Sequence, residues 1–359
     1  MISPYALSVY GGVQEQALAM SRELGRRGHE VLLVSPDVSD HTTYDTTAQL
    51  AHFGRLWSMP ANGSRAPLTL SPLAGRRTRE AVLKFRPDVV HFHEPFAPLL
   101  GWSTLNAHRA AAVGTFHRSG DGPALRLTGP LLRHLATKLD GSVAVSEAAA
   151  RTINTAAGVR AQVLFNGFEL ERFVATPRER SSQVTLLFVG RLEDRKGAKH
   201  LIDAVKAHNA RGGDQWRLIV LGDGQQRTEL EALASSDPMI LFVGAVGDEE
   251  KRVWMRKVDA LVAPSTHGES FGMILLEAMA SETSVVASDI AGYREAVGDY
   301  GVLSKAGDAI ALEAGISSAL ALETSARIGA ARAHAQEWSM QKLIDAYEVV
   351  YANARQRFA

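Results

Sequence analysis

The sequence contains no cysteine among its 359 residues. It therefore cannot form a disulfide, a thiolate metal site or a cysteine nucleophile. It also lacks any run of roughly 18 apolar residues, the length that a membrane-spanning helix needs. The opening stretch MISPYALSVYGG has no basic segment followed by a long apolar run, so we expect no secretory signal peptide.

A charge of one predominant sign is missing as well, because 39 Lys and Arg balance 39 Asp and Glu. Residues 1–170 nevertheless carry a small basic excess, and residues 171–359 a matching acidic one. A mildly basic first half suits an anionic partner, although the signal is too small to indicate nucleic acid. With 46% apolar and 22% charged residues, the composition is that of an ordinary soluble protein.

Short aliphatic runs recur between amphipathic helical patterns along the whole chain. In the first half they are EVLLVS (30–35), DVVHFH (88–93), AAVGTFH (111–117) and GSVAVS (141–146). In the second half they are VTLLFVG (184–190), WRLIVLG (216–222), MILFVG (239–244), ALVAPS (260–265) and TSVVAS (283–288). Near-continuous apolar strands that alternate with helices indicate parallel sheets covered on both faces. The length and the two series predict two doubly wound α/β domains.

The segment ELERFVATPRERSSQ (169–183) is charged and contains proline and serine, which marks it as the domain boundary. The first strand is unusual because only Met-Ile-Ser precedes Pro4. Since a doubly wound domain places its first strand centrally, either the natural chain begins upstream or this strand is very short. A final helix over about 340–356 follows with no strand after it.

The stretch HGESFGMILLEAMA (267–280) places two glutamates in apolar surroundings after a predicted strand. We expect a helix to begin near Ser270, with the amides of Phe271, Gly272 and Met273 in its first turn, where they are free to bind phosphate. Glu277 would then lie roughly 7–8 Å further along the axis, within reach of a ribose. Glu269 is better aimed at sugar hydroxyls than at phosphate. Alternatively, Glu269 favours the helix dipole and Glu277 pairs with a Lys or Arg.

Two further loops suit an anionic ligand. In FVGRLEDRKG (188–197), Arg191 and Lys196 follow a strand and would neutralise a leaving diphosphate, whereas Arg195 is expected to face solvent. In VYGGVQ (9–14), two glycines lie between the first strand and a helix, which favours phosphate binding weakly. No Asp-x-Asp stands at a strand end, so no essential metal ion is indicated.

Three histidines lie near strand ends in the first half. His91 and His93 flank Phe92, and we interpret them as alternating across the strand, one buried and one facing the ligand. This arrangement disfavours metal binding by the pair. His117 ends GTFH, at the carboxyl end of a predicted strand; a lone histidine there is either a satisfied core residue or a functional one.

Together, the Gly-Gly after the first strand, FVGR…KG and Glu269-x7-Glu277 in GESFG…LEAMA resemble the retaining GT-B glycosyltransferases of family 4. Within that family, SPYALSVYGGVQ, ANGS (61–64), VVHFHEPFAPLL (89–100), GTFH and HGESFG resemble the actinobacterial phosphatidylinositol mannosyltransferases. The resemblance covers essentially the whole chain. It implies two Rossmann-like domains facing across a cleft: an acceptor-side domain of residues 1–170 with helix 340–359, and a donor domain of residues 171–339.

The resemblance also implies roles for individual residues. Gly12 and Gln14 would face the donor diphosphate and sugar, and His117 would be essential for transfer. Arg191 and Lys196 would hold the diphosphate, and Glu277 the ribose. The hexose and phosphates would contact Glu269, Ser270, Phe271, Gly272 and Met273, and the base would lie near Val246, Asp248 and Lys251. No tightly bound cofactor is implied.

On the acceptor side the sequence departs from the family. Tyr5, Asn62 and Ser64 stand at family positions, but Ala61 replaces a tyrosine and Pro67 stands in place of an arginine. Arg65 is the nearby residue that would substitute for that arginine. The stretch GRRTREAVLKFR (75–86) is cationic and partly apolar, and on a helix it would suit an anionic membrane surface through Arg76, Arg77, Arg79 and Lys84. A plain solvated helix face is the alternative.

These observations predict a retaining hexosyltransferase that uses GDP-mannose and acts on phosphatidylinositol or a related glycolipid. It would be cytoplasmic and peripheral on the inner face of the plasma membrane. A family 4 enzyme with a UDP-sugar and a soluble acceptor is a second hypothesis. A non-catalytic nucleotide-sugar-binding protein, disabled by the short first strand, is a third.

Overall fold

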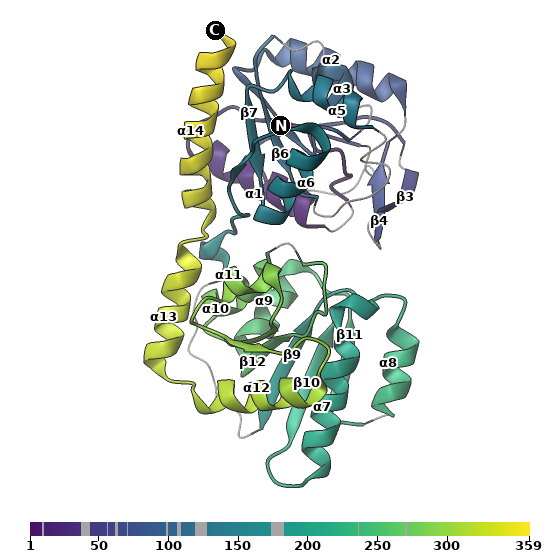
Figure 1. The fold of residues 1–359 in the computed structure, drawn as a ribbon, viewed down its shortest axis with the longest axis vertical. Helices are drawn as coiled ribbons and strands as arrows, with labels where there is room; N and C mark the ends of the chain where they lie inside the picture. The colour runs from purple at the N-terminus through teal and green to yellow at the C-terminus, as the bar shows by residue number, and fades with distance from the viewer. Residues whose placement is uncertain are drawn as a thin grey trace. The chain divides into compact units, whose positions relative to one another are not determined.

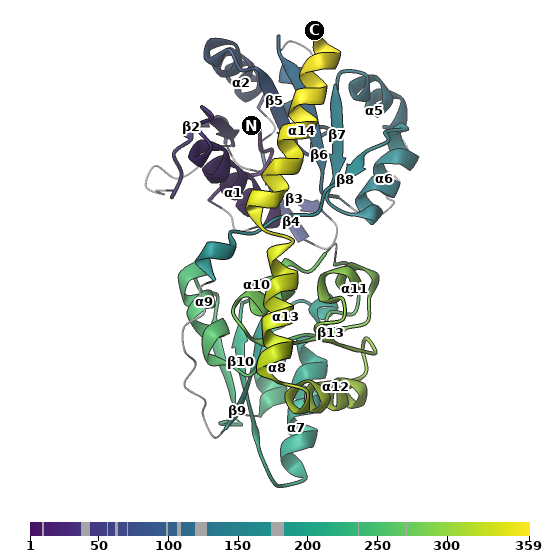
Figure 2. The same cartoon turned by 90° about the vertical axis from the view of Figure 1, so that its left-hand side faces the viewer.

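The computed structural model describes residues 1–8, 11–36, 44–55, 57–61, 64–69, 71–97, 100–105, 109–118, 128–173, 183–235, 237–269 and 271–359, and it gives no side-chain surroundings for 57–61 and 64–68. The chain divides into two compact units (Figures 1 and 2). The first unit is Met1–Phe168 with Met340–Ala359, and the second is Glu169–Ser339.

The first unit contains a parallel sheet whose strands run in the order β2 (Gln49–His52), β1 (Leu32–Ser35), Ile2, β5 (Val89–His93), β6 (Ala111–Phe116), β7 (Gly141–Ala144) and β8 (Gln162–Val163). This is the strand order of a doubly wound sheet. A separate antiparallel hairpin joins β3 (Trp57–Ala61) to β4 (Ser64–Leu68).

The first strand is reduced to Ile2, which bridges Val34 of β1 and Phe92 of β5 in parallel. The amide of Ile2 donates to the His91 carbonyl, and the amide of His93 donates back to the Ile2 carbonyl. Ile2 is buried and packs with the apolar residues of both neighbours. The strand is therefore central but very short, and the sheet is continuous through it.

Helices cover both faces of this sheet. They are α1 (Gly12–Arg26), α2 (Pro72–Phe85), α3 (Leu100–Leu105), α5 (Gly129–Ala136), α6 (Glu147–Ala157) and α14 (Met340–Phe358). The helix α14 comes from the far end of the chain and lies along β6 and β7 (Figure 2), where Ile344 and Tyr347 pack with Val113 and Val143. Val82 of α2 packs in a different cluster with Ile2 and Phe92.

The second unit contains a six-stranded parallel sheet in the order β11 (Ile240–Gly244), β10 (Trp216–Leu221), β9 (Val184–Val189), β12 (Ala260–Ala263), β13 (Ser284–Ser288) and β14 (Val302–Ser304). Its helices are α7 (Ala198–Ala210), α8 (Arg227–Ala234), α9 (Asp248–Lys257), α10 (Met273–Ala280), α11 (Ala291–Val297), α12 (Ala309–Ala321) and α13 (Ser325–Gln336). The winding direction reverses between β9 and β12, and ligands of doubly wound sheets bind outside the carboxyl ends of the strands at such a point.

The predicted fold class is confirmed, since both units are doubly wound parallel sheets with helices on their faces. All nine predicted strands are present within a few residues of their expected bounds. The sequence did not reveal β2, β8, β14 or the β3–β4 hairpin. None of the helices in the described ranges is long and apolar enough to cross a membrane.

Candidate functional site: two clusters at strand ends

The loops that follow β9 and β12 meet in a cluster of opposite charges at the switch point of the second unit. Glu269, on the loop after β12, lies 2.8 Å from Lys196 Nζ and 2.7 Å from Arg195 Nη1. Glu193 pairs with Arg195 and with Arg191 at 3.3 and 2.8 Å. Three cations and two carboxylates thus share one edge of the sheet, and the cations are suited to a phosphate there.

Arg195 is not the solvent-facing residue that the sequence indicated. Its side chain is 19% exposed and bridges Glu193 to Glu269, whereas the side chain of Arg191 is 48% exposed. The physical reason is the short 3-10 turn Asp194–Lys196, which directs consecutive side chains to different sides and brings Arg195 back over the loop after β12. Arg195 therefore belongs to the charged cluster with Lys196.

The helix α10 begins at Met273, three residues later than predicted. Gly272 stands at the N-cap with a φ of 87°, a left-handed conformation that a side chain disfavours. A Cβ at this position would also lie 2.6 Å from Tyr293 Cδ1, so a larger residue would need the ring to move. Phe271 consequently lies outside the helix, buried against Trp338 with ring centroids 4.7 Å apart. The amides of the first turn begin at Met273, not at Phe271.

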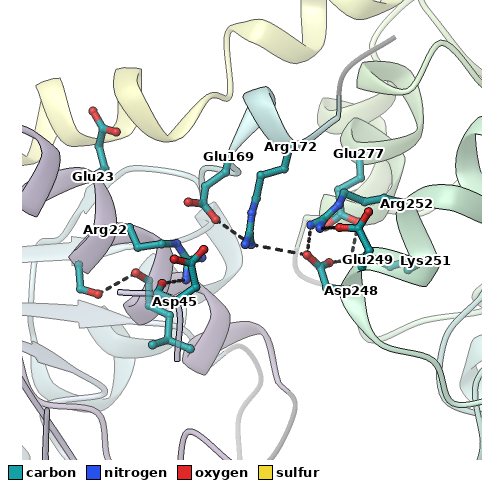
Figure 3. Close-up of polar contacts among 12 residues, drawn as sticks. Arg22, Glu23, Asp45, Glu169, Arg172, Asp248, Glu249, Lys251, Arg252 and Glu277 are labelled. Atoms are coloured by element: carbon teal, nitrogen blue, oxygen red, sulfur yellow. Dashed lines mark hydrogen bonds and ion pairs between the residues drawn. The ribbon is translucent and has the colours of Figure 1, made fainter. Parts of the chain in front are cut away.

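Glu277, four residues after Met273 in α10, has the cationic partner that its burial requires. Its Oε2 lies 2.8 Å from Lys251 Nζ on α9, with side chains 11% and 6% exposed (Figure 3). Lys251 also lies 3.0 Å from Asp248 Oδ1, and Arg252 binds both Asp248 and Glu249. Ion pairing therefore explains why a carboxylate is tolerated in this apolar helix.

Asp248 connects this group to the segment at the start of the unit. Arg172 Nη1 lies 3.6 Å from Asp248 Oδ2 and 3.2 Å from Glu169 Oε2 (Figure 3). Burial alone would raise the pKa of Asp248, but Lys251 and then the two arginines hold that pKa below its ordinary value. Asp248 therefore stays ionised and keeps Lys251 oriented toward Glu277.

The residues predicted to lie near the base follow β11 in the chain. Val246 follows β11, and Asp248 and Lys251 lie in the first turn of α9. Of the predicted donor-binding residues in this unit, Arg191, Lys196 and Glu269 form one cluster, while Asp248, Lys251 and Glu277 form a second. Within the ranges that the structure covers, no group of three or more His, Asp or Glu side chains is arranged to hold a metal ion.

The first unit has its own polar cluster, at the carboxyl ends of β5 and β6. His117 follows β6, and its Nε2 lies 3.1 Å from Nδ1 of His93, the last residue of β5. Glu94 accepts hydrogen bonds from the backbone N–H groups of His117 and Arg118, both at 2.6 Å to Oε1. Burial lowers the pKa of His117 to about 3, so the imidazole is neutral at physiological pH.

The expected placement of His91 and His93 was wrong. Residues i and i+2 of a strand face the same side, so it is Phe92 that points to the other one. Both histidines are buried, at 2% and 1% exposed, and their rings stack with centroids 4.6 Å apart. His91 is satisfied by Tyr351 of α14 and by Thr115, each at 2.7 Å.

Three further predicted residues of the first unit, Tyr5, Gly12 and Gln14, lie before or at the start of α1. Tyr5 is half-buried, and burial followed by the nearby Glu94 carboxylate raises its pKa. Gln14 lies in the first turn of α1 and is buried, with its amide 3.4 Å from the Ala6 carbonyl, whereas Gly12 is exposed at the start of that helix. The side chain of Gln14 is thus turned toward its own loop.

Four predicted residues cannot be placed in the same way. Asn62 and Ser270 lie outside the described residues. Ser64 and Arg65 lie on β4, opposite Ala61 and Pro60, but their side chains are not among those described. Their expected contact with an acceptor stays a prediction.

The basic stretch predicted at 75–86 lies on α2. Arg76, Arg77, Arg79 and Lys84 are all exposed, and so are Leu73 and Leu83, while Thr78 and Val82 are buried. Arg76 is engaged by Glu80 on the next turn, at 2.8 Å. The outward face of α2 is therefore cationic with two exposed leucines.

Three features of these clusters were not predicted from the sequence. Arg195 was assigned to solvent, and neither Glu94 nor the contact of His93 with His117 was expected. The strand pattern carried the missing signal for the histidines, because His93 and His117 end neighbouring parallel strands and such residues meet at one edge. No short-range sequence pattern indicates the role of Glu94. This residue directly follows β5 and has a left-handed backbone conformation, with a φ of 50°.

Two protein-family models match the chain, one after the other. Residues 10–172 match the family described as Glycosyltransferase Family 4, and residues 171–335 match that described as Glycosyl transferases group 1. The glycosyltransferase of Rickettsia africae ESF-5, a solved structure, aligns over 98% of both chains with a TM-score of 0.77 and 18% identity, which supports the fold.

Curated relatives are similar over most of their length. The phosphatidyl-myo-inositol mannosyltransferase of Mycobacterium tuberculosis H37Rv is 36% identical over 309 residues, 83% of this chain and 79% of that protein. The protein of the same name from Mycolicibacterium smegmatis is 33% identical over 98% of this chain and 93% of its own. A GDP-mannose-dependent alpha-mannosyltransferase of M. smegmatis is 30% identical over 97% and 96%. With two doubly wound units and these matches, the chain belongs to glycosyltransferase family 4 and has the GT-B fold.

Proposed function

We propose that this glycosyltransferase transfers a mannosyl residue from GDP-mannose, with retention of configuration, to phosphatidylinositol or a related glycolipid. The observation that carries the proposal is the 33% identity over 98% of the chain with a protein named phosphatidyl-myo-inositol mannosyltransferase. The name of a second relative supports GDP-mannose as the donor. The charges of the second unit and the basic helix of the first unit are compatible with these two substrates.

The cations at the ends of β9 and β12 suit the diphosphate of the donor. Arg191 and Lys196 would bind its oxygens, and Arg195 would hold the loop in place. Charge on the diphosphate grows as the sugar leaves, so cations placed there stabilise the transition state more than the ground state. Glu269, now bound to Lys196 and Arg195, would be released by the diphosphate to accept from sugar hydroxyls.

The ribose of the donor would be held by Glu277. A carboxylate, here paired with Lys251, can accept hydrogen bonds from two neighbouring hydroxyls. The base would lie toward Val246 and the first turn of α9.

Retention follows from attack on the face of the sugar that the diphosphate leaves. The bond between the anomeric carbon and the phosphate oxygen breaks, the acceptor oxygen bonds to that carbon, and the acceptor proton passes to the departing diphosphate. No protein nucleophile is needed in this scheme, and the residues supply positioning and charge. His117, neutral because of its lowered pKa, would orient donor and acceptor oxygens.

The outward face of α2 would bring the enzyme to an anionic membrane surface. Arg77, Arg79 and Lys84 are exposed, and Leu73 and Leu83 add apolar contact beside them. Each basic residue near such a surface contributes about 1 kcal/mol of attraction. The same helix would then hold the enzyme at the inner leaflet and bring it close to a lipid acceptor.

A two-step assay tests the proposal. Thermal shift with GDP, UDP and ADP identifies the base, because a ligand at 100 times its dissociation constant adds about 2.7 kcal/mol of stability. Purified protein is then incubated with radiolabelled GDP-mannose and vesicles containing phosphatidylinositol. We expect a shift with GDP and label in the lipid extract; a shift with UDP alone, or label only in water-soluble product, would contradict the proposal.

A UDP-sugar enzyme with a soluble acceptor is the second candidate. The departures from the family at the acceptor segment favour it, since Ala61 and Pro67 stand where a tyrosine and an arginine are expected. Transfer to free inositol phosphate but not to phosphatidylinositol vesicles would support this second candidate.

A further inference from the structure

His91, His93 and His117 lie together at the carboxyl ends of β5 and β6, and His93 has a single polar partner among the described residues. Nδ1 of His93 lies 3.1 Å from Nε2 of His117. Nε2 of His93 is enclosed and meets no hydrogen-bond partner in the part of the chain that the structure describes. His91 is no alternative partner, because its two nitrogens bind Thr115 and Tyr351 and it touches His93 only by ring stacking.

Each of the two rings carries one proton. Burial lowers the pKa of His93 well below its ordinary value and that of His117 to about 3, so both are neutral at physiological pH. A hydrogen bond between two neutral imidazoles has one N–H donor and one bare acceptor nitrogen. Two arrangements are therefore possible, and they differ in which ring donates.

The enclosed Nε2 of His93 distinguishes the two possible hydrogen-bond arrangements of His93 and His117. If His117 donated from Nε2, Nδ1 of His93 would be bare and its proton would sit on the enclosed Nε2 with nothing to receive it. Buried N–H groups without an acceptor are rare in folded proteins, and unpaired acceptors are less so. If His93 donates from Nδ1, the enclosed Nε2 is bare, and the remaining N–H, on Nδ1 of His117, is not among the enclosed atoms without a partner in the described residues. The second arrangement is favoured.

We propose that His93 is a positioning residue that fixes the tautomer of His117, so that His117 presents Nδ1–H to the substrates as a hydrogen-bond donor. This inference rests on the proposed function for the substrate it assigns to His117. The backbone of His117 is held independently by Glu94, which receives its N–H and that of Arg118. His117 is half-buried, and among the described residues its Nδ1 is not one of the fully enclosed polar atoms that, like Nε2 of His93, lack a partner.

The chemical consequence is that His117 is no general base. A neutral imidazole that carries its proton on the substrate side cannot take another from the acceptor hydroxyl there. It binds an oxygen lone pair of the sugar or the phosphate instead, and a donor aimed at developing negative charge accelerates group transfer. The acceptor proton then leaves with the diphosphate, as in the scheme above.

Nitrogen NMR of the whole protein labelled with ¹⁵N-histidine tests the tautomer without any substrate. The His117 signals are assigned by their loss in His117→Gln. We expect long-range ¹H–¹⁵N couplings to show a protonated Nδ1 and a bare Nε2 on His117 at neutral pH. A protonated Nε2, or protons on both nitrogens, would overturn the proposal whatever the enzyme transfers.

Variants of His93 test the positioning role. His93→Asn keeps an N–H close to the place of Nδ1–H, whereas His93→Leu has none. We expect His93→Leu to lower kcat by about tenfold or more with KM for the donor nearly unchanged, and to lose the single tautomer of His117, while His93→Asn keeps both. Thr115→Val is the matched control, because it removes a buried hydrogen bond of His91 without touching the His93–His117 contact.

The outcomes separate the two claims. An equal fall of kcat in His93→Asn, His93→Leu and Thr115→Val, in step with their unfolding midpoints, would reduce His93 to a structural residue and overturn the proposal. If wild-type protein transfers no sugar from any nucleotide but shows the expected tautomer, the proposed function fails and the assignment of His93 stands.

Discussion

Lys251 Nζ lies 2.8 Å from Glu277 Oε2, and both side chains are almost completely enclosed. A buried carboxylate without a cation is strongly destabilising, so Lys251 accounts for the presence of a glutamate in the apolar helix α10. The proposed ribose contact would add a binding role to this structural one.

Removing the charge of Lys251 should lower the stability of the fold. Lys251→Met leaves Glu277 buried and unpaired, and we expect the free energy of unfolding to fall by about 3 kcal/mol. Lys251→Met combined with Glu277→Gln should recover part of this loss, because a neutral amide needs no cation. Urea denaturation of the four proteins of the cycle gives the coupling. Additive effects would mean that the two residues do not interact energetically.

Glu277→Ala should weaken nucleotide binding. Two ribose hydroxyls would lose their acceptor, and we expect calorimetry to show a loss of about 1–3 kcal/mol in the binding of free GDP. Glu269→Ala should leave free GDP unaffected and weaken only the sugar nucleotide, since Glu269 is assigned to the hexose. Wild-type affinity of Glu277→Ala for GDP would remove this residue from the donor site.

Lys196→Ala and Arg191→Ala should slow transfer far more than they alter folding. In the proposed reaction these cations would meet charge that develops on the leaving diphosphate, so we expect a loss of about 100-fold in kcat for each. Lys199→Ala is the matched control, because Lys199 is exposed on α7 only three residues after Lys196. Wild-type turnover of Lys196→Ala at saturating donor would show that the loop is a plain charged surface.

The repeated strand–helix pattern was sufficient to predict the fold class. Strands such as Leu186–Phe188 are buried on both faces and read as continuous aliphatic runs, which few other structures produce. The strands that escaped prediction are short or polar at the sheet edge: β14 has three residues, and β2 is QLAH. At such places pairing with a neighbour, not local sequence, decides the conformation.

The site could be predicted only in part, because ion pairing is a tertiary property. Lys196 and Glu269 were both named as ligand-binding residues, yet nothing local indicated that they would bind each other at 2.8 Å. Arg195 was misplaced for the same reason. Gly272 could be recognised as a special position, but not that its left-handed backbone delays the start of α10 to Met273.

The buried histidines should make stability depend on pH. Their pKa values are lowered in the folded state, so both states are neutral above about pH 6.5 and the contribution is complete there. Below that pH the unfolded chain binds protons first, and each buried histidine then costs about 1.4 kcal/mol per pH unit. Burial raises the pKa of Glu94 in the folded state, so protonation of this carboxyl favours the fold as the pH decreases, opposite to the effect of the histidines.

A difference between variants isolates this effect. We expect His93→Asn to flatten the fall in unfolding free energy between pH 6 and pH 5 by about 1.4 kcal/mol per unit, measured by urea denaturation. His134→Asn is the control, since His134 is exposed on α5. An unchanged slope in His93→Asn would mean that His93 takes up a proton within the fold.

The last prediction concerns α2. Reversing Arg77, Arg79 and Lys84 to glutamate should abolish binding to vesicles that contain anionic lipid and lower activity on a lipid acceptor, while GDP binding is kept. Arg76 is left unchanged because Glu80 already neutralises it. The attraction is about 1 kcal/mol per basic residue and is screened beyond roughly 8–10 Å at physiological salt, so the difference from wild type should shrink as salt rises.

A matched variant separates this local effect from overall charge. Reversing Lys199, Arg217 and Lys257, three exposed basic residues of the second unit, changes the net charge by the same amount without touching α2. Vesicle co-sedimentation over a salt series should leave this control bound like wild type at low salt. Equal loss of binding in both variants would show that net charge, not α2, holds the protein. Wild-type protein that stays in the supernatant even at low salt would contradict the lipid acceptor and favour a soluble one.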